Sequence, residues 1–118
     1  VVRDERAYVV AETEGLVVLD VSDPSSPVPV GRYDTPGFAW GISLEGNIAC
    51  IADLSSVQMI DVSAPESPVL LGAFQTPAGA ESVAAVDGLI HVADYESGLW
   101  IFSPVERAGI RAERWKRY

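Results

Sequence analysis

A phrase of 17 residues occurs twice in this chain, 41 residues apart. It reads DVSDPSSPVPVGRYDTP over Asp20–Pro36 and DVSAPESPVLLGAFQTP over Asp61–Pro77. Ten of its positions are identical, among them the opening Asp-Val-Ser, the next proline, the Ser-Pro pair and the closing Thr-Pro. A fixed period of this size indicates one supersecondary unit per repeat, with the units stacked on one another around a shared core.

Within each period the apolar residues form short runs rich in Val, Ile and aromatic residues, bounded by Gly, Pro, Asp and Ser. Such runs are typical of β-strands. The predicted strands are Ala7–Ala11, Leu16–Asp20, Val28–Tyr33, Ala39–Leu44, Ile48–Ala52, Val57–Asp61, Val69–Phe74, Glu81–Val86, Leu89–Ala93 and Leu99–Phe102. Four strands in about 40 residues is the size of one β-propeller blade, so the sequence predicts an all-β fold built from four-stranded antiparallel blades.

The repeated phrase itself has the chemistry of a corner between two strands. The side chains of Asp20 and Ser22 are placed to accept hydrogen bonds from backbone N–H groups just downstream. Pro24 and Pro27 fix φ and stop the strand from continuing. We therefore expect each blade to use this phrase once, as a turn.

These residues resemble a known repeat. GLVVLDVSDPSSPVPVGRYDTP is similar to the LVIVD repeat of β-propeller proteins, VQMIDVSAPESPVLLGAFQTP is a second copy, and GLWIFSPV is a degenerate third with Ser103 in place of the Asp. The resemblance places repeats at about residues 7–36, 37–77 and 78–105, followed by a basic tail at 106–118. It implies a propeller scaffold and an extracytoplasmic or cell-surface location, and it implies no particular activity.

A closed propeller needs at least four blades, or about 160 residues at this period, and the chain has 118. The alternatives are a piece of a longer propeller, a ring completed by further copies, or an open stack of about three blades. The opening residues, Val1–Asp4, have the pattern of the end of an innermost strand and its turn. Because exposed strand edges are templates for pairing, we expect self-association through the blade edges.

The tail, RAGIRAERWKRY, departs from the repeat and leaves two structures open. It fits the outer strand of a third blade, and it also fits an amphipathic helix with Ile110, Arg114 and Trp115 on neighbouring faces. Its density of Arg, Ala, Glu and Lys favours the helix.

The charge of the chain argues against nucleic acid as a partner. The net charge is −9, divided into −12 over residues 1–105 and +3 over residues 106–118. Affinity for a phosphate backbone depends on Lys and Arg, and residues 1–105 contain only three, against 15 Asp and Glu. No apolar run approaches the ~20 residues of a transmembrane helix.

No catalytic constellation stands out in the sequence. His91 is the only histidine and Cys50 the only cysteine, and both occupy apolar positions in the second strand of a repeat, aligned with Val9. A packed histidine and a buried, inert thiol are the expected roles. With one of each in different repeats, neither a Ser-His-Asp nor a Cys-His arrangement is predicted.

Acidic residues recur just after the second strand of each repeat, at Glu12, Asp53 and Asp94. Their expected role is to accept turn N–H groups in every blade. A ring of carboxylates can also bind Ca²⁺, but the spacing shows no calcium loop. Asp53 and Asp94 are therefore only weak candidates for metal ligands. No other cofactor is expected.

Function in repeat proteins tends to lie where the repeats differ. Trp40 and Glu81 occupy the same slot at the start of the innermost strand, and Tyr95 with Glu96 lies in an equivalent turn. These four are the candidate ligand-facing residues. The repeated scaffold residues, the acidic surface and the lack of a catalytic constellation favour a non-enzymatic module that binds a protein or surface polymer, as a fragment or subunit of a larger propeller. The alternative is part of a propeller enzyme, a metal-assisted hydrolase or lyase with its site in the central channel.

Overall fold

The computed structural model describes residues 1–105 and 111–117, with side chains as far as Ser103. This part of the chain is all β, and no helix occurs in it. The strands are β1 (Val2–Arg3), β2 (Arg6–Ala11), β3 (Gly15–Asp20), β4 (Val28–Tyr33), β5 (Gly41–Glu45), β6 (Ile48–Ala52), β7 (Leu54–Asp61), β8 (Val69–Val86), β9 (Leu89–Asp94), β10 (Gly98–Val105) and β11 (Arg111–Arg117).

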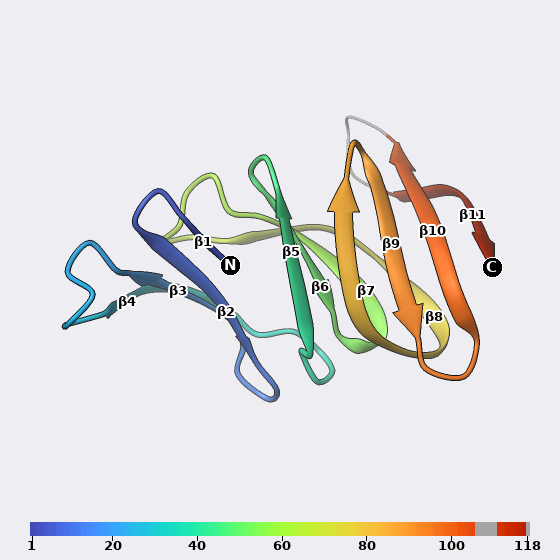
Figure 1. Cartoon of the computed structure of the whole chain (residues 1–118), viewed down its shortest axis with the longest axis horizontal. Helices are drawn as coiled ribbons and strands as arrows, with labels where there is room; N and C mark the ends of the chain where they lie inside the picture. Colours follow the sequence, from blue (N-terminus) through green and yellow to red (C-terminus); the bar gives the residue numbers. More distant parts are fainter. Residues whose placement is uncertain (106–110, 118) are drawn as a thin grey trace.

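The strands form antiparallel meanders that correspond to three blades (Figure 1). Blade 1 is the sheet β1-β2-β3-β4, and the other sheet has the order β11-β10-β9-β8-β7-β6-β5. In that second sheet, residues 69–75 of β8 pair with β7, whereas residues 80–86 pair with β9. One long strand is thus the outermost strand of blade 2 and continues as the innermost strand of blade 3.

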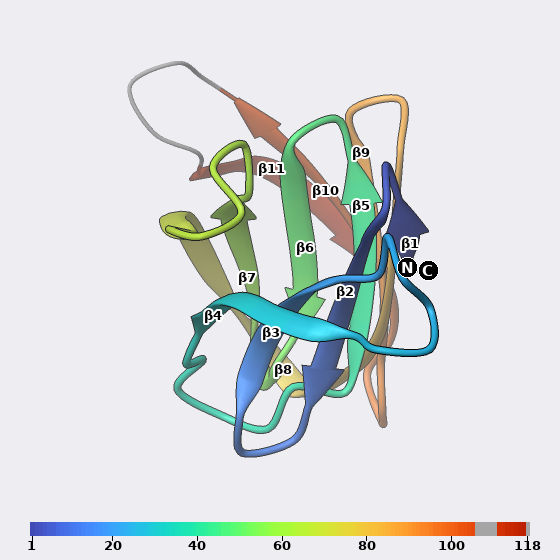
Figure 2. The ribbon, with the colours of Figure 1, turned by 90° about the vertical axis from the view of Figure 1, so that its left-hand side faces the viewer.

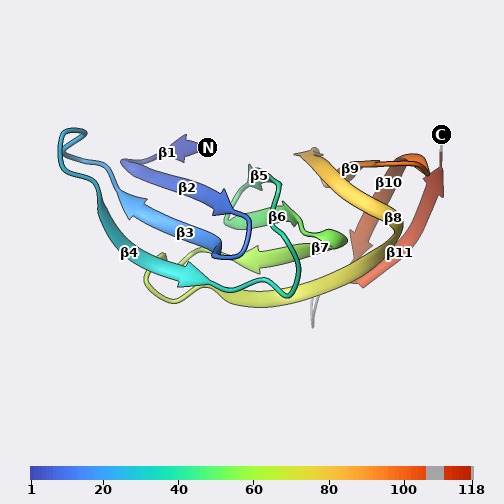
Figure 3. The ribbon, with the colours of Figure 1, turned by 90° about the horizontal axis from the view of Figure 1, so that it is seen from below.

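The prediction of four strands per period is confirmed, and so is the pairing of the first residues, Val2–Arg3, as an innermost strand. The sequence predicts two strands at 69–74 and 81–86, and the structure joins them because the connecting residues stay extended. The equivalent connection before β5 does not form a continuous strand. Seen from below, the three blades follow an open arc, with β4, β8 and β11 along its outer side (Figure 3).

The tail prediction that composition favoured is wrong for residues 111–117. These residues form β11, which pairs antiparallel with β10 from Trp100↔Arg117 to Val105↔Arg111. Without a partner strand, the edge of β10 would have unpaired N–H and C=O groups. By pairing with them, the tail forms hydrogen bonds in place of those that it would form in a helix, so strand pairing overrides its helix propensity. The outer-strand alternative is confirmed; Ile110 lies outside the described residues.

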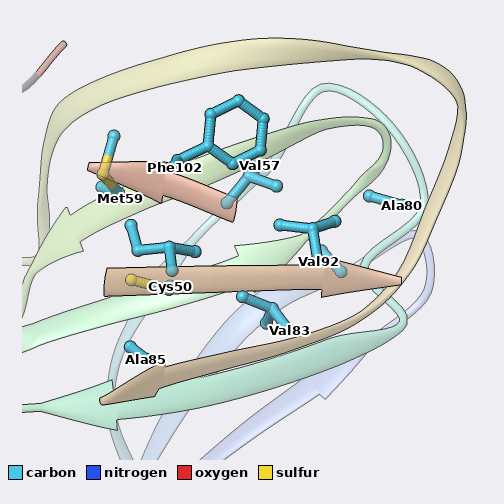
Figure 4. Packing of buried hydrophobic residues seen from close by; sticks show 10 residues of the cluster. Cys50, Val57, Met59, Ala80, Val83, Ala85, Val92 and Phe102 are labelled. Atoms are coloured by element: carbon cyan, nitrogen blue, oxygen red, sulfur yellow. The ribbon is translucent and has the colours of Figure 1, made fainter. Parts of the chain in front are cut away.

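The hydrophobic core lies between blades rather than within one. In blade 2 the side chains alternate, so that Ala49, Ile51 and Ile60 face blade 1 while Cys50, Ala52 and Met59 face blade 3. The cluster between blades 1 and 2 contains Tyr8, Leu16, Val18, Ala39, Ala49, Ile51, Ile60 and Val62. The cluster between blades 2 and 3 contains Cys50, Ala52, Val57, Met59, Ala80, Val83, Ala85, Ile90, Val92 and Phe102 (Figure 4). Each blade therefore depends on its neighbour for burial of its apolar surface.

The repeated corner has the predicted geometry. In blade 1 the Asp20 carboxylate accepts hydrogen bonds from the Ser22 backbone N–H at 2.9 Å and from the Ser22 hydroxyl at 2.7 Å. In blade 2 the Asp61 carboxylate accepts the Ser63 N–H at 2.8 Å. Ser22 therefore donates its hydroxyl to the acid instead of accepting a backbone N–H.

The corner of one blade also lies against the outer strand of the blade before it, which explains a repeated glycine. A Cβ added to Gly31 in β4 would lie 1.9 Å from the carbonyl oxygen of Pro65 in the corner of blade 2. Any side chain at this position would force the two backbones apart. Gly31 is thus a spacing residue between blades 1 and 2. Figure 2 shows the molecule from the side of blade 1, with blades 2 and 3 behind it.

Candidate binding edge

The candidate residues gather along one edge of the blades. We call this the lower edge: residues 12–14, 53–55 and 95–97, which turn between the second and third strands, and residues 34–40 and 76–81, which connect one blade to the next (Figure 1). Backbone hydrogen bonds join these pieces, with Ala39 N–H donating to Glu12 C=O at 3.0 Å and Tyr95 N–H to Gly79 C=O at 2.9 Å.

Two buried aspartates hold the lower edge together. Asp53 Oδ2 accepts the Gly37 N–H at 2.9 Å, and the Asp94 carboxylate accepts the N–H groups of Ala78 at 3.1 Å and Gly79 at 2.5 Å. Both aspartates are fully buried, and each fixes the segment that enters its own blade. The predicted role as acceptors of backbone N–H groups is confirmed for these two residues.

Asp94 is the better satisfied of the two. It also accepts the Ser97 hydroxyl, which in turn accepts the Trp100 Nε1–H at 2.7 Å. Burial is the largest single influence on its pKa and raises it, but the hydrogen bonds from Ser97, Gly79 and Ala78 together outweigh burial. The net effect holds the pKa of Asp94 below its ordinary value of 3.8, so the residue is an anion in the folded protein.

Glu12 does not share this environment, and the prediction that it does is wrong. It is exposed, and only its backbone carbonyl takes part in the lower edge. The cause is a one-residue shift: Leu16 pairs with Val10 in blade 1, whereas the equivalent Val57 pairs with Ala52 in blade 2. Glu12 therefore lies one residue farther into its turn than Asp53.

The slot shared by Trp40 and Glu81 opens to solvent in both blades. Trp40 is 54% exposed, an unusual state for an indole, and Glu81 is exposed as well. The two positions are neighbours, because a Cβ added to Gly41 would lie only 3.1 Å from the Glu81 carbonyl oxygen. An exposed aromatic residue and an exposed acidic residue therefore lie in neighbouring backbone segments, where the innermost strands of blades 2 and 3 begin.

The second predicted pair is exposed in the turn between β9 and β10. Tyr95 is 70% exposed and Glu96 is exposed beside it. Sequence reasoning missed Phe38 and Leu54, which are 45% and 37% exposed on the same edge. A sequence signal for Leu54 was available, since it is an apolar residue between two predicted strands; in the structure its φ is +55°.

Cys50 and His91 occupy equivalent positions with different surroundings. Cys50 is buried between blades 2 and 3, and burial, with a smaller contribution from Glu45, raises the pKa of its thiol to about 12. His91 lies on the opposite side of blade 3 from blade 2, partly exposed, with Nδ1 3.3 Å from the Ala84 carbonyl oxygen. Among the described residues, no three His, Cys, Asp or Glu side chains lie close enough to share a metal ion. Calcium binding stays an untested prediction.

Comparison with protein families decides the class of the chain. The family model of the LVIVD repeat matches residues 1–35 and 36–76, which is well over half of the sequence. The chain belongs to the LVIVD repeat family. No curated protein matches it. No helix of the described residues has the length and apolar character to cross a membrane.

Carboxylates in this LVIVD protein give its stability a predictable pH dependence. Hydrogen bonds lower the pKa of Asp20 and Asp61, chiefly from Ser22 and Ser63, and the pKa of Asp94 is lowered as described above. A carboxyl group whose pKa is lower in the folded state stabilises that state fully above its unfolded pKa. The contribution is lost as the pH falls through the lowered pKa, so acid favours unfolding.

We expect the urea midpoint to be constant near neutral pH and to fall steadily between about pH 5 and pH 2. Equilibrium unfolding followed by circular dichroism across this range tests the expectation. The Asp94→Asn variant should show a smaller acid-induced fall than the parent. A midpoint that is unchanged or higher at acid pH would contradict the assignment.

Proposed function

We propose that this repeat module is a non-enzymatic binding protein whose lower edge binds a basic segment of another protein. One observation carries the proposal: the acids that recur, Asp53 and Asp94, are buried against backbone N–H groups, while the residues that differ between repeats, Trp40 and Glu81, are exposed. Groups used for the scaffold are thus separate from groups left free for a ligand.

The chemistry of the exposed residues favours a cationic partner. The lower edge combines the rings of Phe38, Trp40 and Tyr95 with the carboxylates of Glu81 and Glu96. Aromatic faces and carboxylates together attract Lys and Arg side chains through cation–π contacts and ion pairs. Complementary charge across an interface steers the encounter and disfavours partners of the same charge.

The basic residues at positions 1–103 neutralise only part of this edge. Over residues 1–103, Arg32 pairs with Glu14 of the lower edge at 3.1 Å, whereas Arg6 pairs with Asp20 at 3.9 Å and Arg3 donates to the Gly46 carbonyl. Glu81 and Glu96 have no ion-pair partner among these residues. Within residues 1–103, the carboxylates of Glu81 and Glu96 are therefore left for a cationic partner.

The test is a titration of the chain with short oligo-arginine and oligo-glutamate peptides, followed by NMR of the backbone amides. We expect shifts confined to the lower edge with oligo-arginine, and an affinity that falls as salt is raised. The change Trp40→Ala should weaken binding by about tenfold, in line with the ~1.4 kcal/mol that a desolvated cation–π contact contributes. Glu81→Gln should weaken it less.

The matched control is Val69→Ala, which alters an apolar residue that is 57% exposed on the outer strand, away from the lower edge. It should leave binding unchanged. Equal binding of both peptides, or shifts spread over the whole surface, would overturn the proposal. Binding of a neutral polysaccharide such as dextran in place of oligo-arginine would instead point to a surface polymer as the ligand.

A further inference from the structure

In the described part of the chain, two blade faces have no neighbouring blade, one at each end of the arc (Figure 3). In blade 3, Ile90, Val92 and Phe102 pack on blade 2, so pleating turns the alternate residues to the other side. These outward residues are almost all apolar: Val86, Leu89, His91, Ala93, Leu99 and Ile101. Val86 is 55% exposed.

Blade 1 has a corresponding face at the other end. Tyr8, Leu16 and Val18 pack on blade 2, and the alternate residues of the same strands face away from it. The outward set is Val2, Ala7, Val9, Val17 and Leu19, of which Ala7 is only 9% exposed. Val9 is 41% exposed and Val2 is 71% exposed, so this second face is also apolar and open.

The open face of blade 3 continues an interface that the chain already builds. At equivalent places in the hairpins, His91 corresponds to Cys50, Leu99 to Val57 and Ile101 to Met59, as the pairs His91↔Ile101 and Cys50↔Met59 show. Cys50, Val57 and Met59 are buried by blade 3. Blade 3 thus presents to solvent the surface that blade 2 covers with a neighbouring blade.

The open face of blade 1 is the complementary half of that interface. Its pair Ala7↔Leu19 is equivalent to Ala49↔Ile60 of blade 2, and Ile60 is fully buried against blade 1. Blade 3 therefore presents the kind of surface on which a next blade packs. Blade 1 presents the kind of surface with which a blade packs on the one before it. A second copy supplies both.

We propose that the open face of blade 3 binds the open face of blade 1 of a second copy, head to tail. The contact is of the same kind as those between blades within the chain. A head-to-tail interface closes into a ring when the rotation per copy allows it and otherwise extends as an open stack. Two copies that close in this way make a ring of six blades.

The first test is light scattering after size exclusion, with the whole chain at several concentrations. A species of twice the mass of the chain, or a ladder that grows with concentration, supports the proposal. A monomer at every concentration overturns it. Leu99→Glu buries a charge in the interface and should weaken association at least tenfold, whereas Tyr95→Ala on the lower edge should not change it.

Cross-linking tests the head-to-tail direction and does not depend on the charged variant. Val57 of blade 2 and Phe102 of blade 3 lie together between these blades (Figure 4). Leu99 is equivalent to Val57, and Leu19 is equivalent to Phe102, so Leu99 of one copy should meet Leu19 of the next. A mixture of Leu99→Cys and Leu19→Cys chains should form a disulfide-linked dimer under mild oxidation, and neither variant should do so alone. Self-linking of Leu99→Cys without mixed dimer would overturn the proposed orientation.

Discussion

Replacing Asp94 with alanine is expected to lower the free energy of unfolding by about 3 to 5 kcal/mol. The substitution removes an anion that is 1% exposed and leaves the N–H groups of Ala78 and Gly79 and the Ser97 hydroxyl without their acceptor. A buried donor without a partner costs about 1 to 3 kcal/mol, more where the lost acceptor was charged. The loss is a large share of the ~5–15 kcal/mol that holds a typical domain folded.

Urea unfolding measured by circular dichroism gives this difference directly. The matched control is Asp61→Ala, an aspartate of the repeated corner that is only partly buried and accepts from Ser63, and its loss should be much smaller. Asp94→Asn keeps the shape and one acceptor oxygen, so it should fall between the parent and Asp94→Ala. If Asp94→Ala unfolds within about 0.5 kcal/mol of the parent, the buried network does not hold the blade.

The period of the sequence was enough to predict the blades, and its local patterns located several strands to the residue. Val28–Tyr33 and Ile48–Ala52 are predicted and observed with the same limits. Both runs are rich in apolar or β-branched residues and end at turn residues, so local preference and tertiary pairing agree there. Where the two conflict, as in the tail, pairing with β10 decides the structure.

Register is the part of the fold that the repeat did not reveal. Alignment at 41 residues places Glu12 with Asp53 and Asp94, but the hairpin of blade 1 pairs one residue out of step with that alignment. A shift of one residue moves every side chain of a strand to the opposite face. Val9 consequently corresponds to Ile51 in the structure and not to Cys50, and no residue pattern in three short strands distinguishes the two registers.

The sequence predicted which candidate residues differ between repeats. It did not predict which residues of the lower edge are buried and which are exposed. Difference between repeats selected Trp40 and Glu81, and both are exposed on the lower edge. Burial could not be predicted for Asp53 and Asp94, because the N–H groups they accept come from the segment about 16 residues earlier in the chain. The sequence also did not predict which blade faces are covered, since the middle blade and the end blades have the same pattern of apolar residues.

Phe102→Ala is expected to cost about 3 to 5 kcal/mol, because it removes the largest fully buried side chain between blades 2 and 3. The Phe102 ring is 1% exposed, and its centroid lies 3.7 Å from that of Phe74 in β8 at an angle of 35°. The cavity would open between two blades that have few other large contacts, since many of the remaining members of the cluster are Ala or Val. Urea unfolding at low protein concentration measures the loss.

The neighbouring residue provides a control for the alternation on which the blade interfaces rest. Ile101 is in the same strand but on the face turned away from blade 2, so Ile101→Ala should cost much less than Phe102→Ala in the dilute chain. If the two substitutions lowered the free energy of unfolding equally, both faces of blade 3 would be covered. The proposal of an open face on blade 3 would then be wrong. Because stability in a stack of repeats is a sum of units and interfaces, Phe102→Ala should also broaden the transition, with blade 3 unfolding before blades 1 and 2. A single sharp transition at a lower midpoint would show that the three blades unfold as one unit even with this interface weakened.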